Sequence, residues 1–285
     1  MNDHDIEVPE PCKVILLATD GSEFSAGVER VGMEMALQNT SRLHVLRLLL
    51  TQPGTDEAIV EEQDAIASLE QIGAICTQRG IDHTPLMRRA EDPAQGILAA
   101  AREILTHLIV IGRRGRRGLA KHNVGEATTR ILDKQACSVL VVPRLFSYWS
   151  NGVLLVIDPD ETEGDRVAMV AIQLAKSAGI PLTVLLVADE SGDETREANQ
   201  TVNRVVAMAG LQGVHAEGLV QSGDIDDLIL EVARQRSADL IVCEPRDRSV
   251  LDRLFNINKL VQLIGKTHCP VLVVHGDQHN SAAES

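Results

Sequence analysis

The residues best suited to chemistry lie in the stretch from Gly112 to Thr129, GRRGRRGLAKHNVGEATT. Its spacing is set by three glycines, Gly112, Gly115 and Gly125. A glycine directly after a strand lets the main chain approach a ligand that a Cβ atom would hold away. A glycine that opens a helix leaves the first N–H groups pointing outwards, where an anion can bind. Five cations lie among these glycines: Arg113, Arg114, Arg116, Arg117 and Lys121. In an acidic chain, this pattern predicts a loop that contacts phosphate.

Composition and charge narrow the class of protein. The chain has 285 residues, which predicts two domains, and its net charge of -14 argues against a general nucleic-acid binder. Its five cysteines are dispersed and form no CxxC pair, so neither a disulfide framework nor a zinc site is indicated. The first twelve residues are polar, and no apolar run approaches the roughly 20 residues of a membrane span. We therefore expect a cytoplasmic protein without nucleic-acid or membrane partners.

Apolar runs alternate with amphipathic segments along the first half of the chain. Continuous apolar runs are typical of strands buried on both faces of a parallel sheet. Strands are predicted over 13–19, 42–50, 84–89, 107–111 and 138–142, and helices over 22–36, 59–79 and 93–105. The alternation predicts a doubly wound α/β domain with a five-stranded parallel sheet. We expect the strand order 3-2-1-4-5, with Gly80 closing the second helix and Asp92 capping the third.

The second half repeats this series. Strands are predicted over 153–157, 182–187, 215–220, 239–243 and 270–274, and helices over 166–178, 195–210 and, after the cap Asp224, to about 236. When residues 107–142 are set against 239–274, 12 of 36 positions are identical. We predict an arm over 1–12, domains over 13–143 and 152–275, a linker over 144–151 and a tail over 276–285. The aromatic residues Phe146, Tyr148 and Trp149 are expected to fill a groove between the domains.

The strand order predicts where a ligand would bind. Ligands of open α/β sheets bind beyond the carboxyl ends of the strands, where the strand order reverses. The turn at Thr19–Ser22 would then face the Gly112–Gly115 loop, with Asp20 at the base or sugar of a nucleotide. Asp20 could equally cap the first helix. Gly125, Glu126 and Ala127 would offer main-chain N–H groups to phosphates.

Several segments resemble the universal stress protein family, and the resemblance covers essentially the whole chain as two tandem domains. It rests on ATDGS (18–22), EDPAQGIL (91–98), LIVIGRRGRRGL (108–119), Gly125 and the closing CSVLVV and CPVLVV. The glycines fit the family's G-x2-G-x9-G spacing. The resemblance implies an adenine nucleotide alpha hydrolase-like fold, ATP or AMP binding with or without magnesium, and a role in stress response. It also implies pseudo-dimeric pairing of the domains through their fifth strands, and leaves a further homodimer open.

The resemblance implies a nucleotide site in the first domain. Its residues are Ala18, Thr19, Asp20, Leu48, Ile111, Gly112, Arg114, Gly115, Gly125, Glu126, Ala127 and Thr128. One departure is Glu126, where the family has Ser or Thr; an acid in the first helical turn is also simply stabilising. Thr128 can still supply a hydroxyl group.

The second domain departs from the motif throughout. Glu244, Asp247 and Ile257 replace the three glycines, and Asp158-Pro159-Asp160 replaces Asp-Gly-Ser. We therefore expect the second domain not to bind ATP. The acidic residues Glu244, Asp247 and Asp158 could instead form a metal site, or simply face water.

Other interpretations remain open. The arginine cluster could be a solvated loop. The only HxxxH spacing, His275 to His279, lacks the glutamate of a zinc protease motif. A nucleotide-binding stress protein is the leading hypothesis. A slow ATPase, or an interaction protein that binds no nucleotide, are the alternatives.

Overall fold

The computed structural model describes residues 12–114, 124–157, 164–188, 192–244 and 257–275. The first half contains β1 (Val14–Thr19), the 3-10 turn η1 (Glu23–Ser25), α1 (Ala26–Asn39), β2 (Arg42–Leu49), α2 (Asp56–Arg79), β3 (His83–Arg89), α3 (Pro93–Glu103), β4 (Leu108–Gly112), α4 (Glu126–Lys134) and β5 (Ser138–Val142). The second half contains β6 (Val153–Ile157), α5 (Gly164–Ala178), β7 (Leu182–Val187), α6 (Gly192–Leu211), β8 (Ala216–Gln221), α7 (Ile225–Gln235), β9 (Leu240–Cys243), α8 (Ile257–Lys266) and β10 (Val271–Val273). The predicted tail 276–285, and the predicted arm apart from Cys12, lie outside the described residues.

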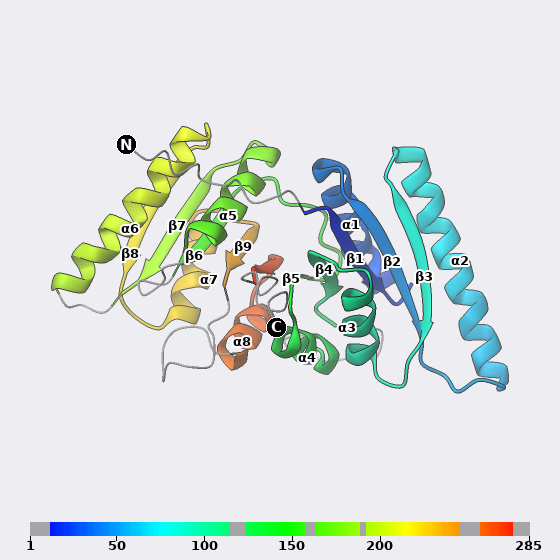
Figure 1. Cartoon of the computed structure of the whole chain (residues 1–285). Helices are drawn as coiled ribbons and strands as arrows, with labels where there is room; N and C mark the ends of the chain where they lie inside the picture. Colours follow the sequence, from blue (N-terminus) through cyan, green and yellow to red (C-terminus); the bar gives the residue numbers. More distant parts are fainter. Residues whose placement is uncertain (1–11, 115–123, 158–163, 189–191, 245–256, 276–285) are drawn as a thin grey trace, which may run out of the picture.

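One continuous sheet of ten strands runs through both halves, in the order β3-β2-β1-β4-β5-β10-β9-β6-β7-β8 (Figure 1). The first half therefore has the predicted order 3-2-1-4-5. The second half has the same order read in the opposite direction across the sheet. Neighbouring strands are parallel except at the junction, where β5 and β10 pair antiparallel with Leu140 opposite Leu272. The two fifth strands thus join the halves, so β5 has a neighbour on each side instead of an open edge.

Helices cover both faces of this sheet. Buried side chains of α1, α2, α5 and α6 form one hydrophobic cluster, and those of α3, α4, α7 and α8 form the other. Both clusters contain residues of both halves, so the core is continuous across the junction. The inner strands β4, β5, β6, β7, β9 and β10 consist largely of buried Val, Ile and Leu because helices cover both of their faces, whereas the edge strands β3 and β8 are more polar.

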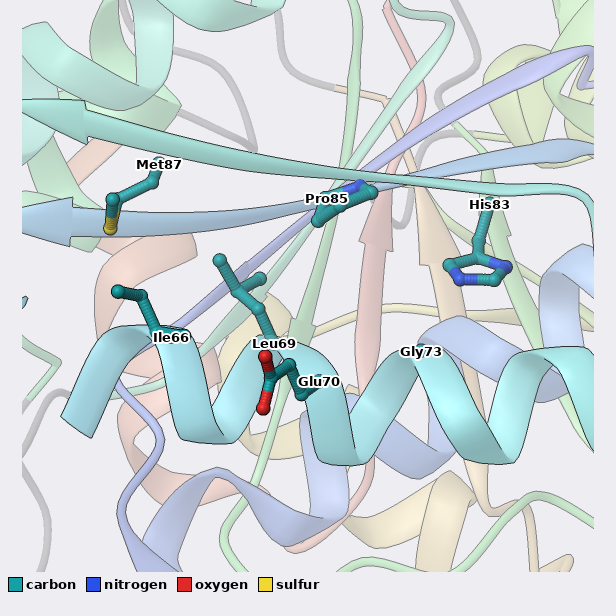
Figure 2. A pocket seen from close by; sticks show the side chains of 7 residues that line it. All are labelled: Ile66, Leu69, Glu70, Gly73, His83, Pro85 and Met87. Atoms are coloured by element: carbon teal, nitrogen blue, oxygen red, sulfur yellow. The ribbon is translucent and has the colours of Figure 1, made fainter. Parts of the chain in front are cut away.

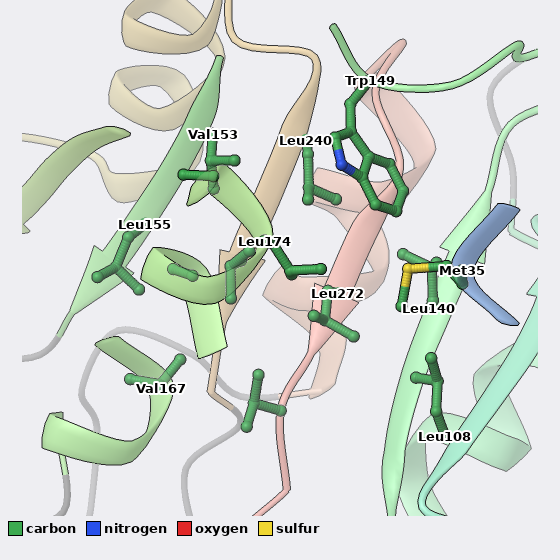
Figure 3. Close-up of a cluster of buried hydrophobic side chains, with 14 of the residues drawn as sticks. Met35, Leu108, Leu140, Trp149, Val153, Leu155, Val167, Leu174, Leu240 and Leu272 are labelled. Carbon is green, nitrogen blue, oxygen red and sulfur yellow. The ribbon is translucent and has the colours of Figure 1, made fainter. Parts of the chain in front are cut away.

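The segment between the halves is packed into the core. Trp149 is only 2% exposed, and its ring stacks on Tyr148 with a centroid distance of 4.0 Å. Figure 3 shows Trp149 beside Leu240 and Leu272 of the second half, with Leu140 of the first half nearby. The prediction that linker aromatics fill the space between the halves is confirmed for Trp149.

Capping residues agree well with the prediction, and helix starts less so. Asp92 and Asp224 cap α3 and α7, and Gly80 closes α2 with a left-handed φ of 71°. The predicted start of α2 at residue 59 is wrong, because Thr55 accepts a hydrogen bond from the N–H of Ala58 and starts the helix at Asp56. The predicted helix over 22–36 is also wrong at its start, where η1 precedes α1. No helix in the described part of the chain is long and apolar enough to cross a membrane.

Candidate functional site

The sheet brings the two ends of the predicted site together. β1 pairs with β2 on one side and β4 on the other, and Ala18 lies opposite Ile111. The strand order reverses between β1 and β4, so their carboxyl ends form the switch point at which open α/β sheets bind ligands. The turn after Thr19 and the chain after Gly112 therefore start from neighbouring positions, as predicted.

The turn after β1 is held by the carboxylate of Asp20. Its Oδ1 atom accepts hydrogen bonds from the N–H of Ser22 at 3.0 Å, the hydroxyl of Ser22 at 2.6 Å and the hydroxyl of Ser25 at 2.5 Å. Ser22, not Asp20, is the N-cap residue of η1. Asp20 therefore organises the turn before the first helix, with its carboxylate fixed by three donors.

An apolar surface lies beside this turn, on the face of the sheet covered by α3 and α4. Ala18, Leu48 and Ala127 are partly buried against the core cluster of that face, and Ile111 is buried in it. Gly96 of α3 allows this packing, because a Cβ there would lie 3.0 Å from Leu48. Partly exposed aliphatic atoms next to fixed polar groups suit a flat ring with polar edges.

The N-terminus of α4 points to the same region and has no side-chain cap. Its N-cap residue is Gly125; side chains cap α2, α3 and α7, while α1, which continues from η1, also has no side-chain cap. The N–H of Gly125 itself donates to the carbonyl oxygen of Arg113 at 2.9 Å, so it would have to break this bond to make the contact with a phosphate predicted from the sequence. The N–H groups of Glu126 and Ala127 in the first turn remain suited to an anion.

Neither Gly112 nor Gly125 has the positive φ that would demand glycine. A Cβ at Gly125 would lie 3.5 Å from the Arg113 carbonyl oxygen, which is an ordinary contact. A Cβ at Gly112 would lie 3.2 Å from the carbonyl oxygen of Arg114, which is tight but does not overlap. The protein's own backbone therefore does not explain why Gly125 has no side chain, whereas a ligand lying against the main chain would.

Two predicted site side chains on α4 behave differently from each other. The hydroxyl of Thr128 is buried and donates to the carbonyl oxygen of Gly112 at 3.1 Å. It ties α4 to the end of β4, and it would have to break this bond to donate to a phosphate. Glu126 is exposed, so its carboxylate lies in water at the first turn, where it favours the helix.

Arg113 does not serve the site as the sequence suggested. Its Nη1 atom lies 2.9 Å from the carbonyl oxygen of Thr267, and 3.2 Å and 3.3 Å from those of Ile264 and Gly265. These carbonyls belong to the C-terminal end of α8, which carries the negative end of the helix dipole. Arg113 therefore binds the second half, whereas the prediction was that this cationic loop contacts phosphate.

Three arginines, Arg113, Arg114 and Arg144, lie close together at the ends of β4 and β5. Burial and the neighbouring Arg144 lower the pKa of Arg114, and burial together with Arg114 and Arg144 lowers the pKa of Arg113. The guanidinium of Arg144 stacks 3.8 Å above the ring of Phe24, in the turn that follows Asp20. Sequence reasoning missed Arg144, although a cation two residues after a predicted strand was a usable signal. Mutual repulsion among these arginines would be relieved by an anion.

Some predicted residues cannot be placed. Gly115, Arg116, Arg117 and Lys121 lie outside the described residues, as do Asp158, Pro159, Asp160, Asp247 and His279. In the second half, Glu244 follows β9 and Ile257 is the first residue of α8, partly buried against the core. A carboxylate and a β-branched side chain thus occupy positions that glycines occupy in the first half. Among the described residues, no group of three or more His, Cys, Asp or Glu side chains is placed to hold a metal ion.

A separate apolar groove lies at the outer edge of the sheet, between α2 and β3 (Figure 2). It encloses about 310 Å³ and is lined by Ile66, Leu69, Glu70, Gly73, His83, Pro85 and Met87. Gly73 leaves room for the ring of His83, because a Cβ there would lie 3.1 Å from its Nε2 atom. The groove reflects helix–strand packing away from the switch point and shares no residue with the predicted site.

Comparisons with known proteins agree with the fold and the repeat. A sequence model of the Universal stress protein family matches residues 11–143 and 151–275. A universal stress protein of Methanocaldococcus jannaschii is 25% identical over 142 residues, covering 46% of this chain and 82% of that protein. The universal stress protein YxiE of Bacillus subtilis is 26% identical over 144 residues, covering 45% of this chain and 97% of that protein.

Solved structures show the same tandem arrangement over nearly the whole chain. A universal stress protein from Archaeoglobus fulgidus superposes with a TM-score of 0.72 at 21% identity, covering 92% of this chain and 96% of that one. A protein of unknown function from Pseudomonas aeruginosa superposes with a TM-score of 0.71 at 18% identity, covering 93% of each chain. Because the family model matches twice and spans nearly the whole sequence, this chain belongs to the universal stress protein family, as a tandem member with two such domains.

Proposed function

We propose that the first half binds an adenine nucleotide, ATP or AMP, and that the second half acts as a structural and regulatory partner in place of a second subunit. The observation that carries this proposal is the end of β4 and the start of α4. There, the N-terminus of α4 has no side-chain cap, and Gly112 and Gly125 are glycines although neither has a left-handed φ. Arg114 and Arg144 lie nearby. Main-chain N–H groups with cations suit phosphates.

The remaining parts of the site suit the rest of a nucleotide. The partly buried Ala18, Leu48 and Ala127 offer an apolar surface for a base, and Asp20 offers a fixed carboxylate for a base or sugar. The arginines next to the glycine loop would meet the phosphate tail, and any magnesium would accompany the phosphates. The second half lacks these features, since Glu244 and Ile257 stand in place of Gly112 and Gly125.

The role proposed for the second half rests on contacts across the junction. β10 pairs with β5, and the end of α8 accepts the guanidinium of Arg113. The main-chain oxygen of Arg113 in turn accepts the N–H of Gly125. The second half therefore holds one end of the predicted phosphate loop through a single residue.

The proposal is tested by replacing Gly125 with isoleucine, the residue that the second half uses. Titration calorimetry with ATP and AMP should show about one nucleotide per chain for the natural protein. Gly125→Ile should weaken binding by about a hundredfold or more, because a branched side chain would lie against the helix N-terminus.

The matched control is Gly210→Ile. Gly210 is an exposed helical glycine of the second half, and a Cβ there meets nothing within 4 Å. The Gly210→Ile variant makes the same substitution away from the site, and its affinity for ATP should equal that of the natural protein. Undetectable binding by the natural protein, or equal affinities for Gly125→Ile and Gly210→Ile, would contradict the proposal.

A further inference from the structure

A buried polar cluster lies directly beneath the Asp20 turn, on the face of the sheet covered by α1 and α2. The hydroxyl of Thr19 donates to Oε1 of Glu29 at 2.5 Å. The guanidinium of Arg47 is 3.3 Å from the carbonyl oxygen of Thr19. Thr19 and Arg47 are each only 7% exposed. The cluster joins β1, β2 and α1, and sequence analysis singled out neither Glu29 nor Arg47.

The turn rests on this cluster. The hydroxyl oxygen of Thr19 also accepts the N–H of Gly21 at 3.0 Å. Gly21 has a left-handed φ of 65°, and a Cβ there would lie 3.1 Å from Cζ of Arg47. The turn therefore leaves no room for a side chain between its main chain at Gly21 and the guanidinium. Thr19 fixes the start of the turn through its side chain and its carbonyl group, and Asp20 fixes the remainder.

The second half shows that the fold does not need this cluster. In the sheet, Ile15 pairs with Leu43 and Leu108, whereas Val153 pairs with Leu182 and Leu240. These pairs align the strands of the two halves. The left-handed residues that end α1 and α5, Thr40 and Gly179, align the two helices. Thr19, Glu29 and Arg47 correspond to Ile157, Ala168 and Leu186, which are at most 4% exposed.

Buried charges usually need a reason beyond stability. Replacing a buried ion pair by apolar side chains is often neutral or stabilising, because the charges lose their hydration. Burial raises the pKa of Glu29 and the nearby carboxylate of Asp20 adds to that rise, while Thr19 and Arg47 act against it. Burial also lowers the pKa of Arg47, against the attraction of Asp20 and Glu29. Burial thus disfavours the charged forms, and the attraction between Arg47 and the half-buried Glu29 offsets part of that cost.

We propose that Thr19, Glu29 and Arg47 are positioning residues that hold the Asp20 turn in the geometry required to recognise the base and sugar of a nucleotide. The inference rests on the proposed function. A ligand group that meets a preorganised carboxylate avoids the entropy of ordering it, and the second half, which carries no such site, has replaced the cluster with apolar side chains.

The test replaces the cluster with the residues of the second half, in the double variant Glu29→Ala with Arg47→Leu. We expect a folded protein whose thermal midpoint is equal to or above that of the natural chain. Its affinities for adenosine, AMP and ATP should fall by a common factor of about tenfold or more, because the lost restraint acts at the base and sugar. Binding of inorganic tripolyphosphate, which lacks a base and sugar, should not change.

Two outcomes decide the inference. A common loss for adenosine, AMP and ATP with unchanged tripolyphosphate binding supports it, and unchanged nucleotide affinities overturn it while leaving the proposed function intact. If the double variant does not fold, Glu29→Gln with Arg47→Met, a neutral pair of similar volume, replaces it.

Hydrogen exchange separates this inference from the proposed function. The amides of Gly21 and Ser22 should exchange faster in the variant than in the natural protein, without any ligand present. Should the natural chain bind no nucleotide, the proposed function fails, and the exchange rates still report whether the cluster holds the turn. Equal exchange rates would overturn the inference.

Discussion

The chain after β4 and the chain after β9 leave equivalent positions of one sheet, yet they carry different residues. Gly112 and Gly125 leave the main chain bare in the first half, whereas Glu244 and Ile257 occupy these places in the second. Strand order and the faces of the sheet that the helices cover correspond in the two halves. The fold therefore determines where a ligand could bind, and a few side chains at the strand ends determine whether one could.

The residues that follow β4 and β9 also differ at the position of Arg113. Arg113 reaches the carbonyl groups at the end of α8, but its equivalent in the second half is Pro245, which has no cationic side chain. A symmetric pair of identical subunits would carry the same residue at both positions, whereas a tandem chain can differ between them.

The largest expected effect tests whether the two halves behave as one unit. Trp149→Ala removes a buried side chain between them and should lower the free energy of unfolding by about 3–5 kcal/mol, through lost burial and the cavity left behind. Urea unfolding followed by circular dichroism should show a single transition moved to lower urea. The exposed linker residue Leu145 provides the control, since Leu145→Ala should change little. Two separate transitions in the natural protein would contradict a single cooperative unit.

A smaller loss of stability is expected when the contact between Arg113 and the end of α8 is removed. Arg113→Ala leaves three carbonyl groups at the end of α8 without their guanidinium and should destabilise the chain by about 1–2 kcal/mol. Arg113→Lys should recover part of this loss. The control is Arg42→Ala, which breaks an exposed pair with Asp82 and should cost less than about 0.5 kcal/mol. If Arg113→Ala and Arg42→Ala give equal midpoints in thermal unfolding, the contact adds no stability.

The smallest effect concerns the ion pair between Asp92 and Arg130, which joins the start of α3 to α4. Asp92 pairs with Arg130 at 2.5 Å, whereas the residue equivalent to Arg130 in the second half is Gln262. Hydrogen bonding from the N–H of Gln95, together with Arg130, lowers the pKa of Asp92. Its stabilisation is therefore present above the unfolded value of about 3.9 and is lost as the pH falls through the lower folded value.

Asp92→Asn keeps a good N-cap residue but removes this charge. Because the pair is partly exposed, we expect a loss of about 0.5–1 kcal/mol at pH 7, which should vanish at a pH below the folded pKa. Urea unfolding at the two pH values measures the difference. Asp224→Asn, at the matching cap of α7, should show no comparable loss. A deficit for Asp92→Asn that persists in acid would mean that the cap, and not the ion pair, was lost.

Local patterns predicted the element types well because their causes are local. Asp92 and Asp224 bond to N–H groups two or three residues away, and Gly80 supplies a left-handed residue at the end of its own helix. The start of α2 was missed because Thr55, a cap by its hydroxyl group, stands in a segment with few apolar residues. For the site, the turn at Asp20 and the glycines of the β4–α4 segment were identified from residue types and spacing alone.

Sequence alone determined the repeat, the alternation of strands and helices, and the difference in glycine content between the halves. Each of these follows from the order of residue types along the chain. Only the tertiary structure decided that Arg113 turns to Thr267, 154 residues away, and that Arg47 lies beneath Gly21. Long side chains reach partners that only chain folding brings close. A charged residue within an apolar run indicates that it has a buried polar partner, but the packing of the whole sheet determines which partner that is.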